Sequence, residues 1–180
     1  TGEDPSMNVT VAKSAGFCFG VKKAVETVEK SINEHSPLYT FGEIIHNPQV
    51  VERLKKRGVN PIENIDEIQD GTVIIRSHGA PKTIFDKLRQ KNIKIIDATC
   101  PFVARIQKIV QKALQKDEFI VIIGERSHPE VIGISGHCEN RAVVVNSQDE
   151  AKNIIDTKSN FIIASYCIFF FIGVKYVLSH

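Results

Sequence analysis

A regular alternation of short apolar runs and amphipathic helical patterns constrains the fold of this chain more than any other feature. The runs are "NVTVA", "LYTF", "TVIIR", "IKIID", "FIVIIG", "AVVVN" and "FIIAS". Each is rich in β-branched residues and has about the length of a buried strand. Because a helical pattern separates most successive runs, the sequence predicts an α/β fold of repeated strand–helix units with parallel-type sheets.

The intervening segments carry helix signals. After Gly20, apolar residues recur at helical spacing, with charged residues on the other side. "NPQVVERLKKRG" opens with an Asn-Pro start signal and is expected to end at Gly58. "APKTIFDKLRQK" and "CPFVARIQKIVQKALQK" are each expected to have proline in the first helical turn. In "SQDEAKNII", Ser147 and Glu150 have the spacing of a capping box.

Composition narrows the class of protein. Hydrophobic residues make up 42% of the chain and charged residues 24%, which is typical of a globular protein. The net charge of +2 is spread among acids and does not provide the concentrated basic face that nucleic-acid binding needs. Four cysteines form no CxxC pair, so we expect a reducing compartment and a cytoplasmic protein. Residues 1–6 precede the single methionine, and we expect them to be a cloning remnant outside the fold.

A cysteine or a histidine follows five of the predicted strands. These residues are Cys18, His46, His78, Cys100 and His128, and each lies just past an apolar run. In parallel sheets, the carboxyl ends of the strands and the helix starts that follow them face a common crevice, where ligands bind. We therefore predict one shared polar site built from these five residues.

Chemistry alone leaves the nature of this site open. Cys18 and Cys100 both precede helix starts, where a thiolate is stabilised and can attack or coordinate. Their equivalent positions favour shared coordination, either of zinc or of an iron–sulfur cluster, whose ligands can be far apart in the sequence. The three histidines near helix starts could hold a phosphate or diphosphate group.

Five stretches together resemble a known family. They are "AKSAGFCFGVKKAV", "GEIIHNPQVVERL", "RSHGAP", "IIDATCPFV" and "GERSHPEVIGISG", and the match runs in order from about Met7 to Ser165. These stretches are similar to the successive motifs of the 4-hydroxy-3-methylbut-2-enyl diphosphate reductase family, the last enzyme of the methylerythritol phosphate route to isoprenoids. The resemblance implies three α/β domains, of which this chain would contain about two.

The resemblance also implies a cofactor and a reaction. Family members hold an iron–sulfur cluster (4Fe-4S) on three cysteines and leave one iron open for the substrate hydroxyl. The first two of those cysteines are matched by Cys18 and Cys100. The histidines around the substrate, chiefly its diphosphate, are matched by His46, His78 and His128, and the acid of the proton network by Glu130. Reductive loss of the hydroxyl as water would yield isopentenyl and dimethylallyl diphosphates.

The implied partners are a small allylic diphosphate and an electron donor such as ferredoxin or flavodoxin, with no nucleic acid and no membrane. After Ser165 the chain reads "YCIFFFIGVKYVLSH", and the family's threonine segment and third cluster cysteine have no match there. The apolar stretch 161–174 is shorter than the roughly 20 residues that span a bilayer. Cys167 matches no ligand motif, and we expect Cys138 to be a simple buried or loop cysteine. An alternative function is therefore a non-catalytic N-terminal fragment with partial metal or diphosphate binding.

The expected domain division follows the same pattern. Residues 7–99 are expected to form a first α/β domain and residues 100–165 a second, incomplete one, followed by a divergent apolar tail over 166–180. The boundary is assigned to the long helix after Cys100, although no Gly, Pro or Ser linker marks it.

Overall fold

The first half of the chain forms a parallel four-stranded sheet. The computed structural model describes residues 10, 15–155 and 161–165. The strands of the first sheet are β1 (Leu38–Phe41), β2 (Val59–Ile62), β3 (Thr72–Ile75) and β4 (Lys94–Asp97). Their order is β2-β1-β3-β4, and every neighbouring pair is parallel. All four carboxyl ends therefore lie at the same edge of the sheet.

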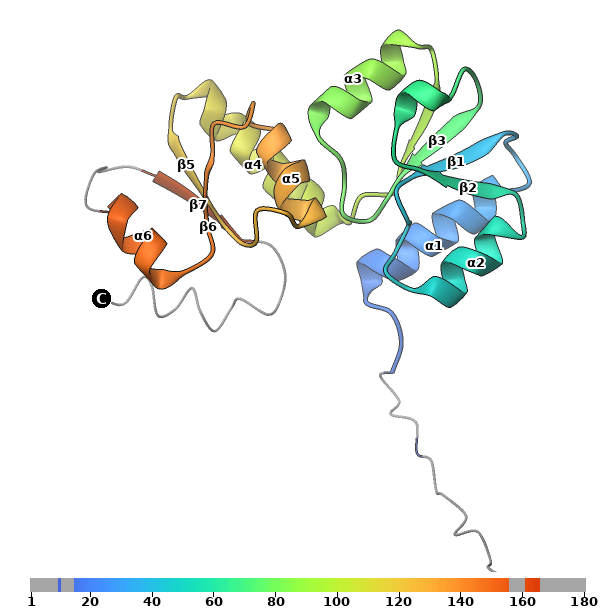
Figure 1. Cartoon of the computed structure of the whole chain (residues 1–180), viewed down its shortest axis with the longest axis horizontal. Helices are drawn as coiled ribbons and strands as arrows, with labels where there is room; N and C mark the ends of the chain where they lie inside the picture. The colour runs from blue at the N-terminus through green and yellow to red at the C-terminus, as the bar shows by residue number, and fades with distance from the viewer. Residues whose placement is uncertain (1–9, 11–14, 156–160, 166–180) are drawn as a thin grey trace, which may run out of the picture.

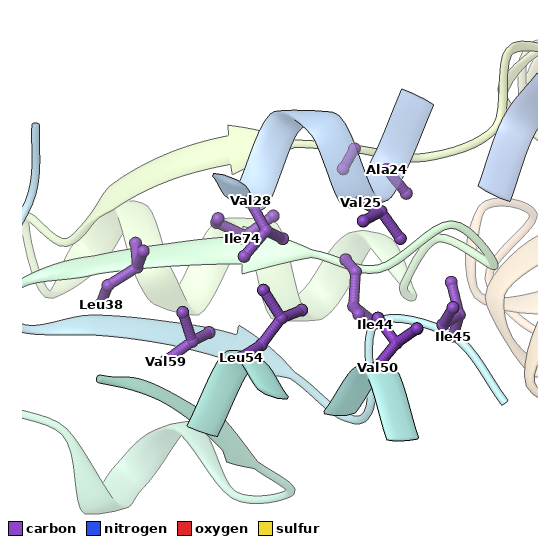
Figure 2. Packing of buried hydrophobic residues seen from close by; sticks show 11 residues of the cluster. Ala24, Val25, Val28, Leu38, Ile44, Ile45, Val50, Leu54, Val59 and Ile74 are labelled. Atoms are coloured by element: carbon purple, nitrogen blue, oxygen red, sulfur yellow. The ribbon is translucent and has the colours of Figure 1, made fainter. Parts of the chain in front are cut away.

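Helices cover both faces of this sheet because its strands are apolar on both sides. Packed on one face are α1 (Phe19–Ser31) and α2 (Pro48–Lys55), and α3 (Lys82–Gln90) with the short η1 (Ile65–Glu67) lies on the other. Figure 2 shows the first of these two cores, in which Val28 of α1 and Leu54 of α2 meet Ile74 of β3. Ile75, the next residue of β3, belongs to the opposite core, as the alternation of a strand requires.

The second half of the described chain forms a separate parallel sheet. Its strands are β5 (Phe119–Ile123), β6 (Val143–Val145) and β7 (Phe161–Ser165), in the order β6-β5-β7. One face is covered by α4 (Pro101–Gln115) and α5 (Pro129–Gly136), and α6 (Gln148–Ile155) lies on the other (Figure 1). The predicted class, an α/β fold with parallel sheets, is confirmed. α5 also contacts α3, so the two halves meet there.

The capping signals at helix starts act largely as predicted. The Asn47 side chain accepts a hydrogen bond from the Val50 N–H at 3.0 Å. The Ser147 hydroxyl accepts one from the Glu150 N–H at 3.2 Å, and the Glu150 carboxylate accepts one from the Asn146 N–H at 3.1 Å. Pro81 differs from the prediction, because it is the N-cap residue of α3 and not part of the first turn.

Other boundaries also differ from the prediction. Helix α2 ends at Lys55 and not at Gly58, since a left-handed turn with φ of 89° at Gly58 closes it, and the Gly58 N–H bonds to the Lys55 carbonyl at 2.9 Å. The sequence did not predict β2, whose run "VNPI" contains Pro61. A proline is tolerated there because β2 lies at the edge of the described sheet.

Two sequence predictions fall where the structure gives no description. The strand expected over "NVTVA" and the tail after Ser165, which includes Cys167, lie outside the described residues. Within 10, 15–155 and 161–165, none of the helices combines the length and the apolar character that crossing a bilayer requires.

Candidate active site

Three histidines from loops at the carboxyl ends of the strands come together. His46 lies between β1 and α2, His78 between β3 and α3, and His128 between β5 and α5. The ring centroids of His46 and His78 are 4.8 Å apart, and those of His78 and His128 are 6.0 Å apart with perpendicular rings. The first two histidines come from one sheet and the third from the other. The predicted meeting of these side chains at strand ends therefore occurs across two sheets.

The environment of the cluster keeps its central imidazole neutral. Burial, together with the nearby charges of His46, Arg76 and His128, lowers the pKa of His78 to about 4. Burial, with smaller contributions from His46 and Arg76, also lowers the pKa of His128. Both effects have the same cause, since a cation here would lose water and gain cationic neighbours. An anionic group placed among these rings would reverse that balance.

Helix α5 joins one of these histidines to a carboxyl group. His128 is its N-cap residue, and its Nδ1 accepts a hydrogen bond from the Glu130 N–H at 3.2 Å. Nδ1 is thus the acceptor, and in the neutral ring the proton lies on Nε2. Burial raises the pKa of Glu130. A carboxyl group that keeps its proton closer to neutral pH is suited to proton transfer.

Both candidate cysteines are N-cap residues. Cys18 precedes α1 and is exposed, whereas Cys100 precedes α4 and is partly buried. The loop before Cys100 is built by Asp97, which accepts hydrogen bonds from the Thr99 N–H at 2.9 Å and the Thr99 hydroxyl at 2.5 Å. The Cys100 N–H then donates to the Ser77 carbonyl at 2.8 Å. Cys100 is therefore bonded to the residue before His78.

Close packing brings the start of α1 against Cys100. A Cβ atom at Gly20, two residues after Cys18, would lie only 2.6 Å from the Cys100 sulfur. A glycine is therefore required where the two cysteine-bearing segments meet. Within the described ranges, no group of three or more His, Cys, Asp and Glu side chains is arranged to hold a metal ion. Two thiol donors of the type that a cluster needs are present, but the donor set is incomplete in this part of the chain.

Sequence reasoning missed two side chains near the cluster that have buried polar atoms, Arg76 and Gln107. Arg76, which directly follows β3, has a buried Nε without a hydrogen-bond partner in the described part of the chain, and so does the Nδ1 of His78. Gln107 of α4 is buried, and its Nε2 is likewise unpaired there. Arg76 stands in the quoted "RSHGAP" stretch, but nothing in the pattern separated it from an ordinary surface cation. The prediction for Cys138 is confirmed, since its side chain is fully buried in the second core.

Comparison with known proteins shows the family of this chain. A family model described as LytB protein matches residues 9–169. The chain belongs to the LytB family. Among curated relatives, the 4-hydroxy-3-methylbut-2-enyl diphosphate reductase of Caldanaerobacter subterraneus subsp. tengcongensis is 48% identical over 153 residues, covering 82% of this chain and 53% of that protein. The reductase of Aquifex aeolicus is 44% identical over 148 residues, covering 80% and 51%.

Two solved structures of reductases share the fold of this chain over the matched residues. A structure of (E)-4-hydroxy-3-methyl-but-2-enyl diphosphate reductase, called the terminal enzyme of the non-mevalonate pathway, is 40% identical with a TM-score of 0.79. It is matched over 94% of this chain and 63% of that one. The E-1-hydroxy-2-methyl-but-2-enyl-4-diphosphate reductase from Plasmodium falciparum is 27% identical with a TM-score of 0.84, over 92% and 53%. The chain spans about half the length of the curated relatives it matches.

Proposed function

We propose that this chain supplies the histidine cluster and two thiolate ligands of an enzyme that reductively dehydroxylates 4-hydroxy-3-methylbut-2-enyl diphosphate. The observation that carries the proposal is the meeting of three histidine rings from two parallel sheets, with a central imidazole of pKa about 4. Relatives with this name share 48% and 49% of their residues with the chain over the matched regions. A cluster of imidazole N–H donors supports the binding of a dianionic or trianionic group.

The histidines bind the diphosphate of the substrate by donating hydrogen bonds from their ring nitrogens. His78 is neutral before the anion arrives, because desolvation and its cationic neighbours disfavour its charge. An anion among the rings favours the protonated forms of His78 and His128, so binding takes up protons. The affinity for the anion should therefore rise as the pH falls below 7.

Cys18 and Cys100 hold an iron–sulfur cluster in this proposal, with a further thiolate from the length of the relatives that the chain does not span. The cluster, when bound, supplies electrons and a Lewis-acidic iron for the leaving hydroxyl. Glu130 holds a proton for that oxygen, since burial raises the pKa of its carboxyl group. Ferredoxin or flavodoxin would supply the electrons, in a cytoplasmic, reducing compartment that keeps both thiols reduced.

Calorimetry with inorganic diphosphate tests the anion site without the cluster. Titration of the chain at pH 7 in buffers of different ionisation enthalpy should show net proton uptake, and His78→Gln should weaken binding at least tenfold. Lys22→Gln, which changes an exposed cation paired with Glu26, serves as the control for general charge effects. Binding that releases protons, or that is equal in parent and His78→Gln, would contradict the proposed diphosphate site.

A second candidate function is that of a non-catalytic fragment that binds a diphosphate or a metal only partly. The incomplete donor set within the described residues favours it. Anaerobic reconstitution with iron and sulfide separates the two candidates. About one cluster per chain together with substrate turnover would exclude the fragment, and colourless protein that still binds diphosphate would exclude intrinsic activity.

A further inference from the structure

One face of α5 lies on the loop that joins β3 to α3, residues 78–81, here called the His78 loop. Gly133, Gly136 and His137 are three and four residues apart and share this face. A Cβ atom at Gly133 would lie 3.5 Å from the first carbonyl oxygen of the loop, and one at Gly136 would lie 2.5 Å from Pro81 Cβ. Gly136 therefore lets α5 pack directly against Pro81 of the loop, whereas a methyl group at Gly133 would make only an ordinary contact with it.

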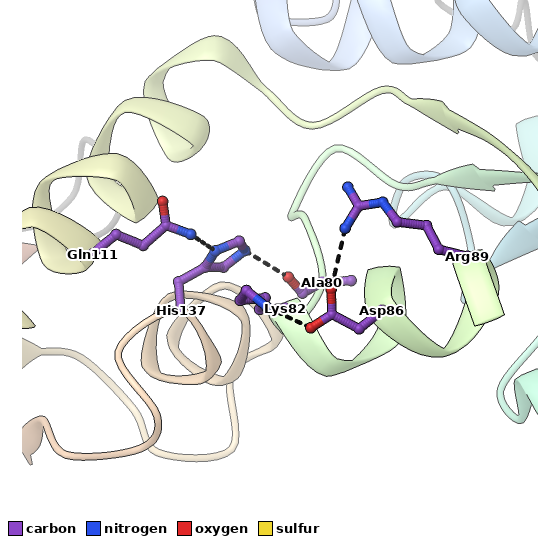
Figure 3. Close-up of polar contacts among 6 residues, drawn as sticks. All are labelled: Ala80, Lys82, Asp86, Arg89, Gln111 and His137. Atoms are coloured by element: carbon purple, nitrogen blue, oxygen red, sulfur yellow. Dashed lines mark hydrogen bonds and ion pairs between the residues drawn. The ribbon is translucent and has the colours of Figure 1, made fainter.

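His137, at the end of the same face, bonds to the loop. Its Nε2 lies 3.1 Å from the Ala80 carbonyl oxygen, and its Nδ1 lies 2.7 Å from the Gln111 Nε2 of α4 (Figure 3). An amide nitrogen only donates and a carbonyl oxygen only accepts. The two partners therefore select one tautomer, with the proton on Nε2 and the lone pair on Nδ1. A second proton, on Nδ1, would face the amide N–H of Gln111.

Helix α4 also packs against the His78 loop, through Gln107. Gln107 lies one turn before Gln111, so both face the same way. A Cβ atom at Gly79, in the His78 loop, would collide with the Gln107 side chain, and one at Gly133 would lie 3.7 Å from its Nε2. The Phe85 ring of α3 lies 6.2 Å from the His137 ring. The loop is thus packed between α3, α4 and α5.

We propose that His137 is a positioning residue that fixes where the His78 imidazole lies relative to His128. Helix α5 starts at the N-cap His128 and ends at the C-cap His137. One short, rigid helix therefore carries one imidazole of the cluster and, at its other end, holds the loop that carries another. The effect of His137 on anion binding rests on the proposed function. The effect of His137 on the position of the His78 imidazole does not.

The tautomer of His137 is the first test. In the 180-residue chain labelled with ¹⁵N-histidine, NMR at pH 7 should show His137 with a protonated Nε2 and an unprotonated Nδ1. A spectrum with the proton on Nδ1, or with both nitrogens averaged by exchange, would overturn the proposal, because the bonds to Ala80 and Gln111 would not hold the ring. This measurement needs no variant and no ligand.

The titration of His78 is the second test. It depends on where the His78 imidazole lies, and a loss of stability alone would not change it. His137→Phe keeps a ring beside Phe85 but removes the bond to the loop, and His137→Gln keeps a donor that reaches Ala80. We expect His137→Phe to raise the proton affinity of His78 at least tenfold from its value in the parent, where the pKa is about 4, and His137→Gln to change it less than threefold. Ile134→Val trims the core side of α5 and is the control for stability loss, with no expected change.

An unchanged titration of His78 in a folded His137→Phe protein would overturn the positioning role. If His137→Phe does not fold, the tautomer in the parent decides. Binding of inorganic diphosphate is measured in the same proteins. If the titration of His78 shifts in His137→Phe but the parent does not bind diphosphate, the positioning role stands and the proposed function is wrong. If the titration does not shift and the parent binds diphosphate, the proposed function stands and the positioning role is wrong.

Discussion

At the scale of single residues, the histidine cluster couples folding to pH. His78 is partly buried beside His46, Arg76 and His128, and its pKa falls to about 4 in the folded chain. In the unfolded chain it returns to about 6.5. The unfolded state therefore binds more protons than the folded state between these two values, and stability rises with pH in that window.

The free energy of unfolding should fall as the pH is lowered from about 6.5 to about 4. The loss attributable to His78 should be on the order of 1–3 kcal/mol, since partial exposure screens the interaction. Urea unfolding at several pH values measures it. In His78→Gln the free energy of unfolding should change less with pH. Part of the pH dependence should remain, because the pKa values of His128 and His137 are also lowered. The raised pKa of Glu130 acts in the opposite direction. An equal slope in both proteins would show that His78 is not the group responsible.

A second prediction at this scale concerns Gly20. Gly20→Ala places a methyl group 2.6 Å from the Cys100 sulfur and 3.0 Å from its Cβ, so the thiol must move out of its partly buried position. We expect Cys100 to be alkylated several-fold faster than in the parent, as measured by mass spectrometry of labelled peptides. Gly133→Ala, with its nearest non-neighbouring atom at 3.5 Å, is the matched control. Equal alkylation rates in parent and Gly20→Ala would refute the close contact.

At the scale of elements, α5 shows how the tertiary contacts of a helix override its intrinsic preference. Its first turn has an N-cap and Pro129 at the first position, and its core side carries Val131 and Ile134. Its other side has two glycines, which cost helix stability unless close packing requires them. A Cβ atom added at Gly136 would clash with Pro81, whereas one added at Gly133 would make an ordinary contact, so only Gly136 is required by packing.

Gly136→Ala should destabilise the protein by about 1–3 kcal/mol, because the new methyl group meets the ring and Cα of Pro81, which cannot turn away. Gly133→Ala, three residues earlier, should be neutral or stabilise by about 0.5–1 kcal/mol, since its neighbours lie at ordinary contact distance. Chemical denaturation of the two variants compares them directly. A Gly136→Ala protein as stable as Gly133→Ala would mean that α5 does not pack tightly on the His78 loop.

The sequence predicted most elements because their signals are local. The apolar runs that became β1, β3, β4 and β5 carry their own period, and Asn47 and Ser147 mark helix starts by their own side chains. The strand β2 was missed because Pro61 argues against a strand unless its edge position is known. The contact of Gln111 with His137 joins two helices of the second half, and that of His137 with Ala80 joins the two halves, so neither contact has a local sequence pattern.

At the scale of the whole molecule, two parallel sheets bring their strand ends to a common site. We retain the division near Thr99 and Cys100 as a proposal, and note that α4 packs with α5 and β5 of the second sheet. Because each histidine follows the carboxyl end of a predicted parallel strand, the sequence could predict that histidines far apart in the chain would meet. How the two sheets sit against one another could not be predicted from the sequence, because it depends on contacts such as that of His137 with Ala80.

Hydrogen exchange should reveal the centres of the two sheets. β3 is buried at all four of its positions and lies between β1 and β4, and β5 lies between β6 and β7. The amides of Val73–Ile75 and Ile120–Ile122 should exchange slowest, at rates limited by global unfolding. Amides of β2 should exchange at least tenfold faster, as followed by mass spectrometry or NMR. Equal protection of β2 and β3 would contradict the described strand order.

Pro61 has a consequence for contacts between molecules. The Ile62 carbonyl accepts a hydrogen bond from the Gly42 N–H at 2.7 Å, so the polar groups of Ile62 face β1. Directions alternate along a strand, and those of Pro61 therefore face outward, where proline has no N–H to donate. A strand from a second molecule that approached this edge would lack a donor at the middle of its ladder. Pro61 thereby discourages the pairing of a second molecule with β2, the edge strand of the sheet that the described residues form.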